Sequence, residues 1–212
     1  MTDMPEVLDE EFWNERYRSS HRLWSGNPNP NLVKEVSDLA PATALDVGCG
    51  EGADAIWLAR RGWTVHGIDL SSVAIERAAE HAAEAGDDIA GRVTWEAADL
   101  LAWDPGATRY DLVSSQYVHL PSGPREVLYT RLADLVAPGG TLLIVGHHPS
   151  DLDTGVPRPP RPELFFTPEE VVALLDPQEW TVDTASATSR TVTHDDHEVT
   201  IHDSVVRAHR SA

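Results

Sequence analysis

A strand, a glycine turn and a helix follow one another without a break and constrain the fold of this chain more than any other feature. Residues 44–52 read Ala-Leu-Asp-Val-Gly-Cys-Gly-Glu-Gly, and residues 53–59 continue as a mainly apolar helical stretch. Glycines remove side chains where the backbone must pass close to a ligand, and the start of a helix offers free N–H groups. The segment therefore predicts a turn that helps to bind a ligand.

An acidic residue ends the next predicted strand, which covers residues 64–68. Asp69 lies twenty-one residues after Gly48. A carboxylate at this place can accept hydrogen bonds from both hydroxyls of a ribose. The turn and Asp69 together predict a pocket for a cofactor that contains a nucleoside.

The glycines alone leave the kind of cofactor open. Gly48, Gly50 and Ala53 fit the spacing G-x-G-x-x-G/A of dinucleotide sites. Asp46, within the strand before the turn, would face a pyrophosphate unfavourably but suits a cofactor with an amino group and a sulfonium. Asp99 ends the third strand region, where it can accept from an adenine amino group. These two acids favour S-adenosylmethionine over a dinucleotide.

The chain resembles the class I S-adenosylmethionine-dependent methyltransferases over about residues 42–148. The ordered set of residues that carries the resemblance is Asp46, Gly48, Gly50, Asp69, Asp99 and Pro138-Gly139-Gly140. The resemblance implies that the backbone at Gly48 and Gly50 approaches the methionine part of the cofactor. It also implies that Asp46 holds the cofactor amino group, directly or through water.

The same resemblance assigns the nucleoside part of the cofactor. Asp69 should accept from the ribose hydroxyls, and Leu70 should pack on the adenine. Asp99 should accept from the adenine amino group, with Leu100 adding an apolar contact. The alternatives are an acid at a helix start or on the surface for Asp69, and a turn residue for Asp99.

The alternation of strands and helices predicts the fold class. An α/β, Rossmann-like, doubly wound sheet follows from this order, mostly parallel and closed by an antiparallel C-terminal hairpin. Strands are expected at residues 43–47, 64–68, 92–97, 110–115, 141–146, 178–186 and 198–209, and helices at 9–20, 52–61, 71–85 and 123–136, with a further helix after a cap at Asn31 and another that opens at Thr167.

One domain of 212 residues is expected, with four parts. Residues 1–41 form an N-terminal leader, and residues 42–148 form the cofactor-binding core. Residues 149–166 are rich in proline and form a stiff surface connection or a candidate lid. Residues 167–212 supply the closing helix and strands.

The leader resembles, more loosely, that of small-molecule methyltransferases related to the tellurite-resistance and thiopurine enzymes. In those enzymes this segment folds over the cofactor. Arg16 would then neutralise a carboxylate, and Trp24 would wall the pocket. Alternatively, the aromatic residues of the leader simply pack it against the core.

The acceptor side is expected beyond the carboxyl end of the fourth strand, since ligands of open parallel sheets bind there. Gln116 and His119 follow that strand. His119 is the candidate catalytic base for an alcohol or amine, whereas an ionised thiol needs none; a structural histidine is the alternative. His147 and His148 follow the fifth strand and should point to opposite sides of it.

Composition limits the partners. A formal net charge of −19 disfavours nucleic acids and anionic membrane surfaces. The chain shows no signal peptide and no apolar run of membrane-spanning length, so a cytoplasmic location is expected. His194, Asp195, Asp196, His197 and His202 are interpreted as part of a solvated hairpin tip and not as a metal site. The oligomeric state is left open by the sequence.

The sequence thus predicts an S-adenosylmethionine-dependent methyltransferase, which yields S-adenosylhomocysteine. We expect a small-molecule acceptor with a thiol or another chalcogen nucleophile. The alternatives are an NAD(P)-dependent oxidoreductase with the same fold and a protein that binds S-adenosylmethionine without catalysis.

Overall fold

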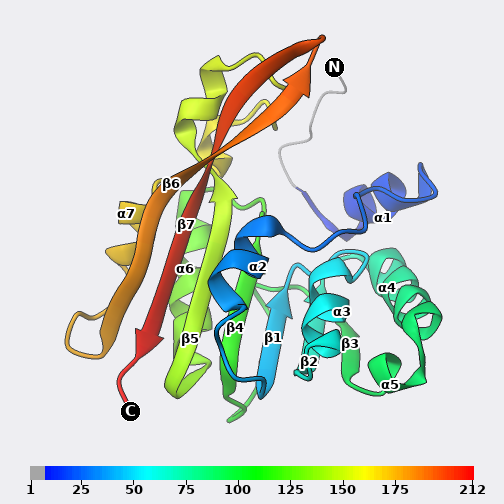
Figure 1. Ribbon diagram of the computed structural model, residues 1–212, viewed down its shortest axis with the longest axis vertical. Coiled ribbons are helices and arrows are strands. Elements are labelled where there is room, and N and C mark those ends of the chain that lie inside the picture. Colours follow the sequence, from blue (N-terminus) through cyan, green and yellow to red (C-terminus); the bar gives the residue numbers. More distant parts are fainter. Residues whose placement is uncertain (1–7) are drawn as a thin grey trace.

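A twisted seven-stranded sheet forms the centre of the protein, as a computed structural model that describes residues 8–212 shows (Figure 1). The strand order is β3-β2-β1-β4-β5-β7-β6, in which β1 to β5 pair in parallel and β7 is antiparallel to both neighbours. The strands are β1 Thr43–Val47, β2 Thr64–Asp69, β3 Val93–Ala97, β4 Tyr110–Gln116, β5 Val136–His147, β6 Trp180–His194 and β7 His197–Arg210. The predicted fold class is confirmed.

Helices cover both faces of the sheet. One apolar cluster joins α6 and α7 to the sheet, and a second joins α2 and α3 to it. The helices are α1 Glu10–Arg18, α2 Pro30–Val36, α3 Ala53–Arg60, α4 Ser72–Ala85, α5 Asp87–Ala90, α6 Ser122–Asp134 and α7 Pro168–Val172, and the 3-10 turns are η1 Pro149–Asp153 and η2 Pro162–Leu164. Within residues 8–212, no helix has the length and apolar character needed to cross a bilayer.

The central strands are apolar on both faces, because helices pack against each side of them. Leu112 and Val113 of β4 are fully buried, as are residues 142–145 of β5. Parallel strands that are covered on both faces read as continuous apolar runs. This is why the core strands were predictable from short sequence windows.

Capping residues fix two helix starts. Ser71 caps α4, as predicted, and its hydroxyl accepts from Ala74 N at 3.1 Å. The predicted cap of α2 at Asn31 is wrong: Asn29 is the cap and accepts from Asn31 N at 2.9 Å. Pro30 explains the shift, because proline is favoured in the first turn, where its missing N–H costs no hydrogen bond.

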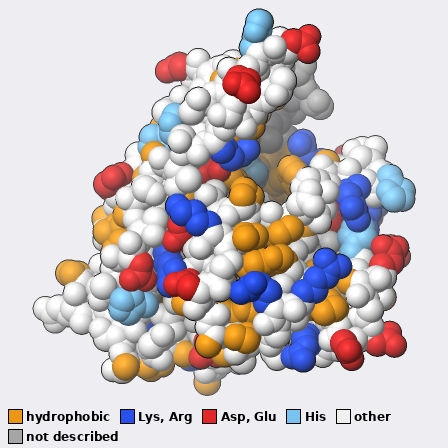
Figure 2. Space-filling view, in the orientation of Figure 1, with side chains coloured by type: hydrophobic (Ala, Val, Ile, Leu, Met, Phe, Trp, Pro, Cys, Tyr) orange, Lys and Arg blue, Asp and Glu red, His pale blue; other side chains and the backbone are white. Residues whose placement is uncertain are grey.

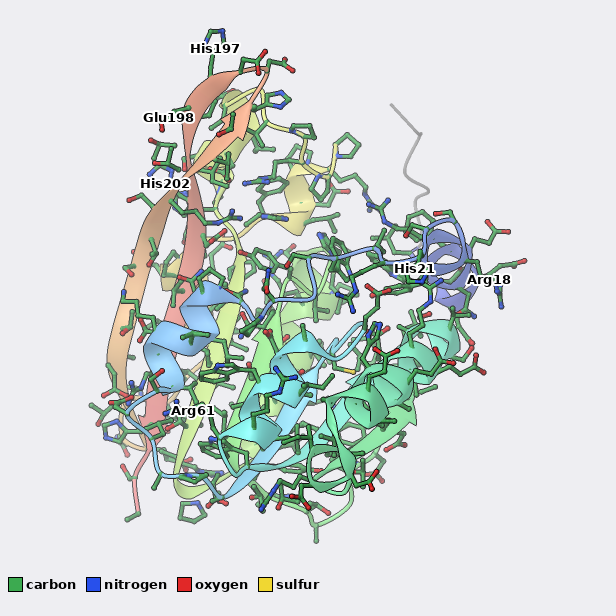
Figure 3. The ribbon with its side chains drawn as sticks, turned by 45° about the vertical axis from the view of Figure 1, so that its right-hand side comes forward. Arg18, His21, Arg61, His197, Glu198 and His202 are labelled. Carbon is green, nitrogen blue, oxygen red and sulfur yellow. The ribbon has the colours of Figure 1, made fainter. Side chains whose placement is uncertain are left out.

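The C-terminal hairpin is longer than predicted and extends β6 to His194. Asp195 and Asp196 form its turn with positive φ angles of 47° and 60°, a geometry that matches the twist of two-residue hairpins. Both are exposed, so the solvated tip is confirmed. Figure 3 shows His197 at the far end of the hairpin and His202 nearer the sheet. Residues 8–212 contain no group of three or more His, Cys, Asp or Glu arranged to hold a metal.

Gly146→Ala should destabilise the protein by about 1–3 kcal/mol through overpacking. A Cβ at Gly146 would lie 2.3 Å from the ring of Phe166, which is buried. Urea unfolding measures the change. Gly123→Ala is the control, since a Cβ there meets nothing within 4 Å. Equal stability of the two variants would contradict this packing.

Candidate active site

The turn between β1 and α3 has a left-handed backbone that only glycine adopts without strain. Gly48 and Gly50 have φ angles of 73° and 54°. Gly48 N and Cys49 N donate to Ile68 O at 2.8 and 3.0 Å, which draws the turn against the end of β2. A Cβ on Gly48 would lie 2.7 Å from Val118. The turn therefore keeps a bare backbone at the wall of the pocket.

Asp69 joins this turn to the start of α4. Its Oδ2 accepts from Gly50 N and its Oδ1 accepts from Ser71 N, both at 2.9 Å. Burial raises the pKa of Asp69. Each carboxylate oxygen can accept more than one hydrogen bond, so these contacts leave Asp69 able to bind a ligand.

Asp46 lies beneath the turn rather than among the residues that line the pocket. It is 1% exposed, and its Oδ2 has no hydrogen-bond partner among the described residues. Burial raises the pKa of Asp46, and the charges of Asp54 and Asp69 raise it further. A buried carboxylate oxygen without a donor suits an ammonium group or a bridging water.

The other predicted site residues line one pocket at the carboxyl ends of the parallel strands. They are Arg16, Trp24, Gly48, Gly50, Asp69, Leu70, Asp99, Leu100, Gln116 and His119. In Figure 2 this region is hollowed between the hairpin tip and the N-terminal helix. The structure thus brings together residues that are far apart in the sequence.

Two of these residues are also engaged in local contacts. Asp99 accepts from Leu101 N at 3.0 Å and is exposed, so it is a turn residue as well as part of the pocket wall. Gln116 accepts from Asn29 Nδ2 and donates to Ser114 Oγ, both at 2.9 Å. Gln116 therefore holds the leader against the end of β4.

Sequence reasoning missed two acids that anchor the leader over the turn. Glu51 accepts from Leu23 N at 3.0 Å and from Trp24 N at 3.2 Å, and Asp54 accepts from Asn29 N at 2.6 Å. Burial raises the pKa of Asp54 to about 6. Their position directly after the glycines was the available sequence signal for a role in the site. Their hydrogen-bond partners could not be predicted, because these lie in a distant segment of the chain.

The leader supplies both packing and pocket wall. Asn14 on α1 accepts from Ser71 Oγ at 2.6 Å, which docks the helix onto α4. Trp24 is 46% exposed and donates from its indole to Tyr17 Oη at 3.1 Å. The two interpretations of the leader aromatics are therefore compatible. Residues 1–7 of the predicted leader lie outside the described residues.

Aromatic rings and histidines enclose the acceptor end of the pocket. The His119 ring centroid lies 5.8 Å from that of Trp13 and 5.7 Å from that of His147, and Tyr117 lies 4.7 Å from His147. His147 lines the pocket, whereas His148 bonds to Ser150 and is not among the lining residues.

Both pocket histidines are neutral at physiological pH. Burial lowers the pKa of His119 to about 4, and the positive charge of Arg16 contributes. Burial likewise lowers the pKa of His147 to about 3, with further contributions from His119, Arg158 and Arg190. Each imidazole can exchange hydrogen bonds with a ligand but binds a proton weakly.

The comparison with known proteins decides the family. Residues 44–140 match a family described as a methyltransferase domain. The 2-heptyl-1-hydroxyquinolin-4(1H)-one methyltransferase of Mycobacteroides abscessus is 32% identical over 172 residues, which cover 77% of this chain and 70% of that protein. The chain belongs to the S-adenosylmethionine-dependent methyltransferases.

This methyltransferase is also similar to two further proteins, in each case over more than the residues that match the family. Thiocyanate methyltransferase 1 of Brassica oleracea is 29% identical over 159 residues, which cover 73% of this chain and 69% of that protein. A solved structure from work on the conversion of a disulfide bond into a thioacetal group during echinomycin biosynthesis has a TM-score of 0.72 at 23% identity. It covers 95% of this chain and 91% of its own, which shows that the fold is shared.

The site fits the cofactor of this family. S-adenosylmethionine carries a sulfonium and an ammonium, and the acids Asp46, Asp54 and Asp69 surround the turn. The unpartnered oxygen of Asp46 and the bare backbone at Gly48 are the observations that support the fit. The assignment of single residues to parts of the cofactor stays a prediction.

Asp69→Ala should weaken S-adenosylhomocysteine binding at least tenfold, given about 1.5–3 kcal/mol for a hydrogen bond to a charged group. Isothermal titration calorimetry measures the change. Asp104→Ala is the matched control, since the one hydrogen bond of Asp104 among the described residues comes from Gly106 N in an exposed loop. Unchanged affinity in Asp69→Ala would remove this residue from the site.

The imidazoles of His119 and His147 should show no titration between pH 8 and pH 5, because burial disfavours their charged forms. Proton NMR of the ring resonances, assigned with single His→Gln variants, measures this. A midpoint near the ordinary histidine value of about 6.5 for either ring would contradict the buried, neutral state.

Proposed function

We propose that this methyltransferase acts on a small molecule whose nucleophile is a thiol or another chalcogen that is ionised before transfer. When bound, S-adenosylmethionine supplies the methyl group from its sulfonium, and S-adenosylhomocysteine is the leaving group. The cofactor therefore needs no further activation. The protein then has to align the acceptor and exclude competing water. The pair of neutral histidines at the acceptor end carries the proposal.

A general base works best when its pKa lies near the operating pH. His119 and His147, with pKa values of about 4 and 3, fall well below that range. The charged groups that act on these histidines are arginines, and arginines favour an anion beside them. An acceptor that is acidic enough to ionise by itself therefore suits the site better than an alcohol or amine. His119 would orient such an acceptor through a hydrogen bond.

The names of two relatives support this class of acceptor. Thiocyanate is a sulfur-containing anion, and 2-heptyl-1-hydroxyquinolin-4(1H)-one carries a hydroxyl on a ring nitrogen. Each of these molecules therefore has a sulfur or oxygen atom that either is part of an anion already or loses a proton readily. A large polyanion such as RNA is a poor partner, because the net charge of −19 repels it.

The oxidoreductase alternative is set aside because the chain belongs to the methyltransferases. A measurement of turnover distinguishes this enzyme from a protein that binds S-adenosylmethionine without catalysis. The cytoplasmic location remains an expectation from the sequence, and the proline-rich segment at 149–166 remains a candidate lid.

His119→Ala should weaken binding of an acidic thiol about two- to tenfold, because one orienting hydrogen bond is lost, and should leave the pH at which methylation of that thiol falls unchanged. For a series of thiols, the acid limb of the kcat/KM profile should move with the pKa of each thiol. Production of S-adenosylhomocysteine measures both effects. A limb that stays at one pH for every thiol would indicate an enzyme base and contradict the proposal.

A further inference from the structure

The proline-rich segment is tied to the sheet by a buried ion pair at the acceptor end. Asp151 is 1% exposed, and its Oδ2 accepts from Arg158 Nε and Nη2 at 3.1 and 2.8 Å. Its Oδ1 accepts from His202 N on β7 at 2.8 Å. Arg158 lines the pocket, and its Nη1 makes no hydrogen bond within residues 8–212. Within residues 8–212, this nitrogen of the guanidinium is therefore left for a ligand.

A second ion pair follows at the next residue of β7. Asp203 is fully buried, and its Oδ2 accepts from Arg190 Nε at 2.8 Å and from Asn31 Nδ2 at 3.1 Å. Arg190 also lines the pocket, and Asp203 does not bind its two Nη groups. Burial raises the pKa of Tyr117; the charge of Asp203 raises it further, and that of Arg190 lowers it. Tyr117 thus lies beside the pair, and its hydroxyl also interacts with the Arg190 side chain.

The charges of both arginines act on the ring of His147. Asp203 is the direct neighbour of His147 across the β5–β7 ladder. His147 Nδ1 is buried and has no hydrogen-bond partner among the described residues. A polar atom of this kind needs a partner from a ligand or water.

Charge is divided along the pocket. The acids Asp46, Glu51, Asp54 and Asp69 surround the glycine turn, whereas Arg16, Arg158 and Arg190 act on the histidines of the acceptor end. Arg158 and Arg190 are each paired with a carboxylate, whereas Arg16 forms no ion pair within the described residues, so the unbalanced positive charge at this end is that of Arg16. In a chain with 35 acidic and 16 basic residues, this distribution opposes the overall charge.

We propose that Arg158, Arg190 and His147 form a subsite for a carboxylate, or a planar oxyanion like it, that the methyl acceptor carries apart from its nucleophilic atom. The inference rests on the proposed function. It narrows the class of methyl acceptor to molecules that carry an anionic group in addition to the ionised nucleophile. Guanidinium groups suit this role because their N–H groups form a fixed fork that matches a planar carboxylate. Tyr117 and Trp13 would pack against the body of such a molecule.

A purely structural role for the two ion pairs makes a different prediction. In that case the arginines hold residues 149–166 and the hairpin in place, and a charge on the ligand has no effect. The comparison must therefore vary the charge of the ligand at constant shape. 4-Mercaptobenzoate and 4-mercaptobenzamide meet this need, since both carry an aryl thiol and differ in one charged group.

Calorimetric titration of each probe in the presence of saturating S-adenosylhomocysteine tests the subsite without turnover. The native protein should bind 4-mercaptobenzoate at least tenfold more tightly than 4-mercaptobenzamide, as expected of a hydrogen-bonded charge. In Arg158→Met/Asp151→Asn and in Arg190→Met/Asp203→Asn, each of which removes a whole ion pair, the preference should fall to about twofold or less.

Three controls separate this effect from misfolding. Asp151→Asn and Asp203→Asn each keep the guanidinium and should keep the preference. Arg210→Met removes an arginine that pairs with Glu179 outside the pocket and should also keep it. S-adenosylhomocysteine affinity should be the same in all variants, which shows that the cofactor half is folded.

Equal affinity of the native protein for the two probes would overturn the subsite, and so would a preference that survives in both double variants. Failure of 4-mercaptobenzoate to bind the native protein would overturn it as well. The proposed function fails separately: a bound 4-mercaptobenzoate that is not methylated when S-adenosylmethionine is present would contradict the acceptor class while leaving the anion preference intact.

Discussion

The close contact between the β1–α3 turn and the end of β2 is the constraint on which the rest of this structure depends. Gly48 N and Cys49 N share the carbonyl of Ile68, and Gly50 N binds Asp69. These bonds form only with a left-handed backbone at the glycines. Because α3 starts from this turn, the same contact sets the start of the helix, the floor of the pocket and the place of Asp69.

Long-range polar contacts then place the remaining walls. The leader is held through Glu51 and Asp54, next to the glycines, and the hairpin is held through Asp203, which binds Asn31 across 172 residues of sequence. Each of these carboxylates is buried or half-buried and has a specific donor, since a buried charge without one is costly. Acids therefore surround the glycine turn, where a cationic cofactor would lie, whereas arginines line the acceptor end, two of them paired with Asp151 and Asp203.

The sequence was sufficient for features that depend on neighbouring residues. Apolar runs gave the core strands, and Ser71 gave the start of α4. It was insufficient where partners are remote: Asn31 was expected to cap α2 but bonds to Asp203, while Asn29 caps the helix. The hairpin extends beyond its apolar residues because ladder hydrogen bonds, rather than burial, support its far end. Asp46 was expected at the cofactor, and its place under the turn leaves its exact contact a prediction.

The most direct test of the account is calorimetric titration of the purified protein with S-adenosylmethionine, S-adenosylhomocysteine and NADH in parallel. The acids around the glycine turn predict micromolar binding of the first two and no binding of NADH. Binding of NADH alone would contradict the account, because a pyrophosphate would then occupy the turn above Asp46 and beside Asp54.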